Sequence, residues 1–317
     1  MRHINIFFFA ISMTILASCK SSPDKITIGY VQITQDPVLD AAKAGVFRAL
    51  SDSGFVDGKN IKVLDNNAQG DLSMINTILQ SLNSQNVDLV ITNSTPCMVA
   101  AAQTIRTTPV VFTVAFSPEQ VGLKSTPANL YGVYDPLKVG EFADMMLECI
   151  PGLKRIGIPY NNAEPNAEYS VKVLSKEFSR RGITLITASV TSPNDILQAG
   201  QYLATQHIDA LVTSADNTVY LGLPVLAKLA SGQKIPLFVT DPLQAEKGAA
   251  IGFGANYDQW GYQAGLKAVE ILKGRVSSNP NIEPIIKYDL IINRKACSDQ
   301  GLVVPETLTT RATRIIK

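Results

Sequence analysis

The sequence contains few of the residues from which metal sites and nucleophilic triads are usually built. Only two of its 317 residues are histidines and only four are cysteines, and no CxxC pair occurs. His3 lies in the N-terminal apolar segment, so His207 alone would have to serve a histidine metal site or a Ser-His-Asp triad. We therefore expect no metal ion, no cofactor and no catalytic residue, and a protein that is not an enzyme.

An excess of charge of one sign is also absent. The chain has 28 Lys and Arg against 27 Asp and Glu, a net charge of +1. This balance provides no basic face, so we expect no nucleic acid partner. The phosphate-binding motif GxxxxGK[ST] is missing too, which excludes ATP hydrolysis by this chain through such a loop.

Three cysteines, Cys97, Cys149 and Cys297, follow the N-terminal region, and this number is odd. We interpret them as small apolar residues of the interior, because no spacing among them suggests metal binding. One disulfide in an oxidising compartment stays open as the alternative.

The N-terminus carries the signature of an exported lipoprotein. An apolar run from Ile4 ends in Leu16-Ala17-Ser18-Cys19, the pattern of small residues before cysteine that a lipoprotein signal peptidase requires. The run is too short to span a bilayer. We predict that residues 1–18 are removed, that Cys19 carries lipid, and that 19–25 form a linker. The protein would lie outside the cytoplasm in the cell envelope, held to a membrane by several acyl chains. An ordinary secretory signal cut elsewhere is the alternative.

The rest of the chain alternates short β-branched runs with longer stretches of helical spacing. This alternation predicts an α/β fold with parallel sheets wrapped by helices. The pattern stops after Pro118 and then restarts, which indicates two similar lobes. The expected strands are 26–31, 61–64, 88–92, 109–114, 130–133, 155–159, 184–189, 210–213, 236–240, 249–253 and 285–292.

Expected helix starts are marked by a side-chain acceptor followed by proline, the order of an N-cap and a first helical residue. In a parallel sheet these starts lie at the carboxyl edge of the strands, where open α/β sheets bind ligands. Free amides and the positive end of the helix dipole make such a start suitable for an anion. The five pairs are Asp36-Pro37, Thr95-Pro96, Asp135-Pro136, Glu164-Pro165 and Ser192-Pro193.

Several separate blocks match a known family in the right order. They are 28–42, 54–60 (GFVDGKN), 67–71 (NAQGD), 94–96 (STP), 154–158 (KRIGI), 161–166 (NNAEPN) and 216–219 (DNTV). With these blocks, nearly the whole chain after the signal closely resembles the ABC transporter substrate-binding lipoproteins of the tryptophan/tyrosine-binding type. Related sequences commonly carry Asp-Pro where this chain has Ser117-Pro118, which weakens the case for an aromatic amino acid ligand.

The resemblance implies a type I periplasmic-binding fold, in which two Rossmann-like lobes joined by three crossovers close on a solute. It places lobe 1 at 26–116 plus 248–275 and lobe 2 at 131–240 plus 284–317. The hinge crossovers would be 117–130, 241–247 and 276–283. The implied function is capture of a small solute, an amino acid that could be aromatic, and its delivery to an ABC permease driven by a separate ATPase. A monomer suits such a clamp.

In the first lobe, four polar residues and one aromatic residue are candidates for the ligand site. Ser94 and Thr95 lie between a strand end and Pro96, where their hydroxyls and the following amides would hold a carboxylate; simple helix capping is the alternative. Gln32 and Asp36 occupy the loop after the first strand, with an N-cap role for Asp36 as the alternative. Phe116 would line the cleft.

In the second lobe, the loop after the strand at 155–159 looks like the family segment that presents Asn161, Glu164 and Asn166 to the ligand, and Tyr160 would line the cleft beside it. Asp216 or Asp241 would pair with an ammonium group, with Asn217 next to the former. Glu164 as a helix-start carboxylate and Asp241 as a hinge-turn residue are the alternatives. Trp260 is expected to pack its helix against the sheet.

Two other functions fit parts of the pattern. A secreted hydrolase could use paired carboxylates such as Glu164 and Asp216, although each has a capping role of equal merit. A ligand sensor would have the same fold and present its closed form to a receptor instead of a permease.

Overall fold

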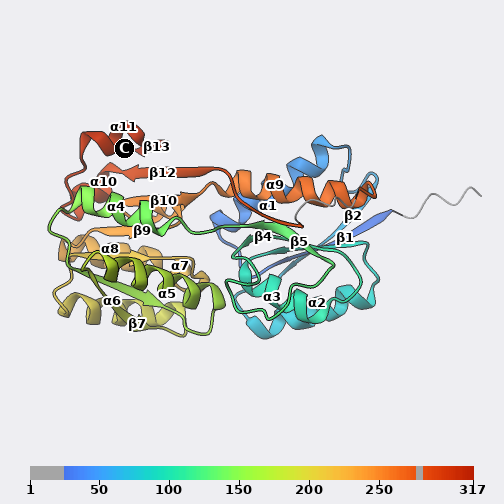
Figure 1. Cartoon of the computed structure of the whole chain (residues 1–317), viewed down its shortest axis with the longest axis horizontal. Coiled ribbons are helices and arrows are strands. Elements are labelled where there is room, and N and C mark those ends of the chain that lie inside the picture. Colours follow the sequence, from blue (N-terminus) through green and yellow to red (C-terminus); the bar gives the residue numbers. More distant parts are fainter. Residues whose placement is uncertain (1–24, 276–280) are drawn as a thin grey trace, which may run out of the picture.

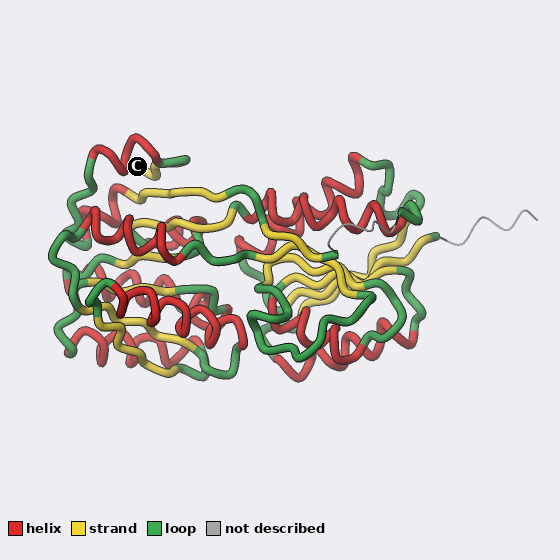
Figure 2. The backbone as a smooth tube through the Cα atoms, viewed as in Figure 1, coloured by secondary structure: helices red, strands yellow, loops and turns green. Residues whose placement is uncertain are grey.

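A computed structural model describes residues 25–275 and 281–317 of the chain. The predicted signal and Cys19, the predicted site of lipid attachment, lie outside the described residues. Two sheets, each covered by helices on both faces, form two lobes side by side (Figures 1 and 2). This confirms the predicted α/β fold class with two largely parallel sheets. No helix among the described residues is long and apolar enough to cross a membrane.

The first lobe has a six-stranded sheet in the order β11-β5-β4-β3-β1-β2, in which all paired strands are parallel. Helices α1 and α9 cover one face and α2 and α3 the other (Figure 1). The strands are β1 (Ile26–Gln32), β2 (Ile61–Asn67), β3 (Leu89–Asn93), β4 (Val110–Ala115), β5 (Leu130–Tyr134) and β11 (Ile282–Pro284), and the helices are α1 (Pro37–Asp52), α2 (Leu72–Ser84), α3 (Thr95–Thr104) and α9 (Tyr257–Leu272).

The second lobe has a seven-stranded sheet in the order β13-β12-β10-β9-β8-β6-β7, in which only the β10–β12 pair is antiparallel. Its strands are β6 (Arg155–Tyr160), β7 (Thr184–Ser189), β8 (Ala210–Thr213), β9 (Leu237–Val239), β10 (Ile251–Ala255), β12 (Tyr288–Asn293) and β13 (Arg314–Ile316). Its helices are α4 (Val139–Cys149), α5 (Pro165–Arg180), α6 (Ile196–Thr205), α7 (Asn217–Leu221), α8 (Leu223–Gln233), α10 (Arg294–Asp299) and α11 (Glu306–Arg311), with 3-10 turns η1 (Pro193–Asp195) and η2 (Pro242–Lys247).

The predicted lobe boundaries differ from the observed strand pairing at three strands. Strand β5, expected in lobe 2, pairs with β4 in the first sheet, and β10, expected in lobe 1, pairs with β9 and β12 in the second. Strand β11, expected in the third crossover and at the start of lobe 2, pairs with β5 in the first sheet. The chain therefore crosses between the lobes at 135–138, near 256 and at 285–287. The predicted crossover 241–247 forms η2 within the second lobe, 117–130 forms a loop of the first, and part of 276–283 lies outside the described residues.

The acceptor–proline pairs mark helix starts in most cases, with two corrections. Asp36 accepts a hydrogen bond from the Val38 N–H (3.0 Å) and starts α1 as expected. At Thr95-Pro96 the N-cap is Ser94, one residue earlier. Asp135-Pro136 starts no helix, because α4 begins only at Val139; the Asp135 carboxylate instead accepts from the Leu137 N–H within the crossover (2.8 Å). Interpreting Asp135 as an N-cap was therefore wrong.

Candidate ligand-binding site

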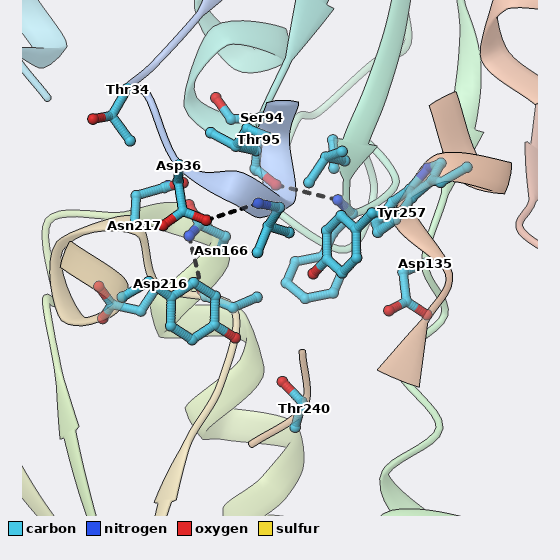
Figure 3. A pocket seen from close by; sticks show the side chains of 18 of the residues that line it. Thr34, Asp36, Ser94, Thr95, Asp135, Asn166, Asp216, Asn217, Thr240 and Tyr257 are labelled. Carbon is cyan, nitrogen blue, oxygen red and sulfur yellow. Dashed lines mark hydrogen bonds between the residues drawn. The ribbon is translucent and has the colours of Figure 1, made fainter. Parts of the chain in front are cut away.

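A cavity lies between the two lobes, at the carboxyl ends of their parallel strands (Figure 3). It encloses about 600 Å³ of space free of protein atoms, counting the part open to solvent. The first lobe lines it with Thr34, Asp36, Val38, Leu39, Ser94, Thr95, Val114, Ala115, Phe116, Tyr257 and Trp260, the first crossover with Asp135 and Leu137, and the second lobe with Asn166, Ala215, Asp216, Asn217, Tyr220 and Thr240.

Direct contacts join the lobes on either side of this cavity. Lys247 of η2 forms an ion pair with Asp36, and the Gln244 side-chain amide lies 3.4 Å from the same carboxylate. Elsewhere, Gln120 donates to the Tyr169 hydroxyl of α5 (2.7 Å), and the rings of Phe116 and Tyr169 lie 4.8 Å apart. The lobes are thus closed over the cavity.

Ser94 and Thr95 form a polar wall where β3 passes into α3. Ser94 has φ 131°, a strained conformation for a residue other than glycine, and its hydroxyl caps the Cys97 N–H (3.4 Å). The Thr95 hydroxyl accepts a hydrogen bond from the Phe116 N–H (3.2 Å), so its own hydrogen is available to donate. A helix start with a free hydroxyl donor favours an anionic group such as a carboxylate.

A network of buried hydrogen bonds lies next to the wall formed by Ser94 and Thr95. Gln32 is buried and donates to the Thr34 carbonyl (2.7 Å) and to Asp40 (2.9 Å). The Asn93 amide donates to the Gln32 side chain (3.2 Å) and to the Tyr30 hydroxyl (2.8 Å). Gln32 therefore fixes the loop that carries Thr34 and Asp36 and does not line the cavity.

In the second lobe, Glu164 connects two helix starts through hydrogen bonds inside the protein. Its carboxylate accepts hydrogen bonds from the backbone and side chains of Asn217 and Thr218 (2.6 to 3.0 Å) and from the Asn166 amide (3.0 Å). These bonds join the start of α5 to the start of α7. All the acceptor capacity of Glu164 is directed into the protein, and it lies outside the cavity wall.

Asp216 and Asn166, at the starts of α7 and α5, face the cavity. Asp216 accepts from the N–H groups of Asn161 (2.7 Å) and Val219 (2.9 Å) and is 4% exposed. Asn166 donates to Glu164 and to the Ala215 carbonyl, whereas its own side-chain oxygen has no hydrogen-bond partner among the described residues. An unpaired buried acceptor beside a buried carboxylate favours a ligand group with several N–H donors.

The cavity wall carries more negative than positive charge. Asp36, Asp135 and Asp216 line it, and the neighbouring Lys247 is already paired with Asp36. Burial raises the pKa of Asp135, and burial together with the nearby Glu164 raises the pKa of Asp216 well above the usual range. A cation inside the cavity would lower both values and stabilise both charges.

The outcome for the predicted site residues is divided. Seven line the cavity, and five do not. The Asn161 side chain donates to Thr218 (3.0 Å), Asp241 caps η2, and Tyr160 ends β6. The seven are Asp36, Ser94, Thr95, Phe116, Asn166, Asp216 and Asn217, and the five are Gln32, Tyr160, Asn161, Glu164 and Asp241.

Several lining residues were not predicted, Asp135 and Thr240 among them. Both follow strands and could have been found from that signal, since β5 ends at Tyr134 and β9 at Val239. Trp260 packs α9 on the sheet as expected, donating from its ring N–H to the Val133 carbonyl (2.7 Å), and also lines the cavity. Cys97, Cys149 and Cys297 are free thiols; Cys97 and Cys297 are buried in the cores.

Asp241 gives a testable pH dependence of stability. Burial, and then the nearby Asp36, raise its pKa well above the usual range. The Asp241 carboxyl therefore binds its proton more tightly in the native state than in the unfolded chain. The contribution of this difference to the free energy of unfolding is complete below the unfolded pKa of about 4, and it is lost as the pH rises through the native pKa. We expect Asp241→Asn, which cannot ionise, to gain stability relative to the wild type between about pH 4 and pH 7. Thermal unfolding across this range measures the difference, and a constant or opposite trend would contradict the expectation.

Two α/β lobes closed over a cavity at their strand ends define a binding protein with the type I periplasmic-binding fold. A family model described as ABC transporter substrate binding protein matches residues 27–316. The chain belongs to this family, which confirms the resemblance predicted from the sequence. It is a substrate-binding protein for a small-molecule solute.

Similar proteins agree with this assignment. The chain is 29% identical over 270 residues to the Tyrosine-binding protein of Clostridioides difficile (strain R20291), covering 84% of this chain and 78% of that protein. An ABC domain from Streptococcus pneumonia, solved in complex with L-Trp, is 24% identical with a TM-score of 0.86, covering 92% and 100% of the two chains. A substrate binding protein with adhesive properties from Clostridium difficile, in its ligand-free, open structure, is 30% identical with a TM-score of 0.69, covering 92% and 99%.

Proposed function

We propose that this protein is the solute-binding lipoprotein of an ABC importer and captures an amino acid with an aromatic side chain. The observation that carries the proposal is the polarity of the cavity wall. Ser94 and Thr95 at the start of α3 suit a carboxylate, whereas Asp216 and the unpaired oxygen of Asn166 suit an ammonium group. An amino acid carries both groups on one carbon atom.

The aromatic residues of the cavity support the second half of the proposal. Phe116, Tyr220, Tyr257 and Trp260 lie on its wall, and flat apolar groups pack well against such rings. The relative named Tyrosine-binding protein points to the same class of ligand. Ser117, where related sequences commonly carry Asp, stays outside the cavity wall, so the departure from the family pattern leaves the binding groups intact.

Delivery and location complete the proposal. The closed lobes would present the solute to a membrane permease whose ATPase is a separate chain, and a monomer suffices for this task. Lipid on Cys19 would anchor the protein to a membrane on the extracytoplasmic side. The family assignment supports the partner class, and the sequence pattern before Cys19 supports the anchor.

Fluorescence titration tests the ligand class, because Trp260 is the single tryptophan of the chain and lines the cavity. We expect tyrosine or phenylalanine to change its emission with saturation at one site per protein. The matching amine without the carboxylate and the matching acid without the ammonium group should bind at least about tenfold more weakly, since each leaves one polar wall unpaired. Failure of every amino acid to bind, or chemical turnover of the bound molecule, would contradict the proposal.

A further inference from the structure

One carboxylate of the cavity is not used by an ammonium group held at Asp216. Figure 3 shows Asp135 on the side of Tyr257, across the cavity from Asp216, Asn217 and Asn166. Asp135 belongs to the first crossover between the lobes and is 5% exposed. Three carboxylates thus line the cavity: Asp36 is paired with Lys247, and a single ammonium group accounts for only one of Asp135 and Asp216.

The two oxygens of Asp135 differ in their partners. One oxygen, Oδ1, accepts from the Leu137 N–H (2.8 Å) and from the Tyr288 hydroxyl of the third crossover (2.9 Å). The other, Oδ2, has no hydrogen bond within residues 25–275 and 281–317. Oδ2 can therefore accept a hydrogen bond from a bound molecule, and in a residue that is 5% exposed this favours a ligand that brings a donor.

Aromatic and apolar side chains surround the space next to Asp135, which suits the far end of an aromatic ligand side chain. Phe116, Tyr257 and Trp260 lie on the wall of the main cavity. Beyond them, Asp135, Leu137 and Thr240 are shared with a second, smaller cavity whose other walls include Phe142 and Phe253. A side chain that starts between Ser94 and Asp216 and passes the aromatic residues would end at this junction.

We propose that Asp135 is a specificity-determining residue that accepts a hydrogen bond from a donor at the far end of the solute's side chain. The substrate class is then narrowed to amino acids whose aromatic side chain ends in an O–H or N–H group, in preference to those that end in carbon. This inference rests on the proposed function, since it assumes an amino acid bound at Ser94 and Asp216. Sites built to bond a hydroxyl discriminate strongly against the analogue that lacks it.

Calorimetric titration of the full protein with tyrosine and phenylalanine tests the inference, because these two ligands differ by one hydroxyl. We expect the wild type to bind tyrosine at least about tenfold more tightly. Asp135→Asn can keep an oxygen on Leu137 and Tyr288 while turning the cavity-facing atom into a donor, so the preference should fall to about threefold or less with phenylalanine binding nearly unchanged. Tyr288→Phe is the matched control, since it removes only a donor to Oδ1 and should keep the preference.

The outcomes separate the two proposals. Equal binding of tyrosine and phenylalanine by the wild type, or an unchanged preference in Asp135→Asn, would overturn the role of Asp135 and leave the amino acid proposal standing. Equal weakening of both ligands by Asp135→Asn would likewise overturn it, because the carboxylate would then act on a group that both ligands share. No binding of any amino acid would overturn both. If Asp135→Asn fails to fold, the affinities of the wild type for tyrosine and for 4-methylphenylalanine are compared instead, because these ligands carry a hydroxyl and a methyl group at the same position. Equal affinities would overturn the inference.

Discussion

Gly261→Ala is expected to lower the free energy of unfolding by about 3 kcal/mol or more, although it adds a single methyl group. Helices α1 and α9 pack with their backbones in contact: a Cβ atom at Gly261 would lie 1.8 Å from the Ala42 carbonyl oxygen, and one at Gly45 would lie 2.1 Å from the Asp258 carbonyl oxygen. The obstructing atoms are backbone, which cannot rotate away like a side chain, so a helix would have to move. Urea denaturation followed by circular dichroism measures the loss.

Gly232→Ala provides the control for this first prediction. Gly232 is also a helical glycine, in α8, but a Cβ atom there would have no neighbour within 4 Å. Alanine has the higher helix propensity, so we expect a change between zero and a gain of about 1 kcal/mol. If Gly261→Ala were as well tolerated as Gly232→Ala, the α1–α9 contact would not be as close as the structure shows.

The same pair of helices shows how far the fold could be predicted from the sequence. Alternating strand and helix patterns identified two parallel-sheet lobes, because the period of apolar residues reports which face of an element is buried. The pattern contains no information on which sheet a strand joins. Strands β5 and β10 were therefore assigned to the wrong lobes, and α9, which follows β10, was correctly placed in the first only because the family resemblance put it there.

For the binding site, the sequence located the right edge of the sheets but could not tell which way each side chain points. Asp216 and Glu164 both follow strands and precede helices, yet only Asp216 lines the cavity, whereas Glu164 accepts its hydrogen bonds from Asn217 and Thr218 inside the lobe. Asp135, in contrast, lines the cavity but was not predicted to do so. Its place before proline was explained by helix capping, and only the pairing of β5 with β4 places it in a crossover between the lobes.

Asp216→Ala is expected to raise the dissociation constant for the amino acid more than tenfold. Asp216 is buried and forms no ion pair within residues 25–275 and 281–317: its partners are the N–H groups of Asn161 and Val219. An ammonium group in the cavity would provide the missing charge, and losing a buried charged partner costs about 2 kcal/mol or more. Calorimetric titration of the variant and the wild type measures the change.

Asp216 also caps α7, so the effect of the lost charge must be separated from that of the lost cap. Asp71→Ala removes another N-cap, at the start of α2, where the carboxylate accepts from the Ser73 N–H (2.8 Å) away from the cavity. It should lower stability by about 1 kcal/mol and leave the dissociation constant unchanged. Asp216→Asn keeps an acceptor for the Val219 N–H but carries no charge, so it should bind nearly as weakly as Asp216→Ala. If Asp216→Asn instead binds as tightly as the wild type, the ammonium group is held elsewhere and Asp216 serves only to shape the start of α7.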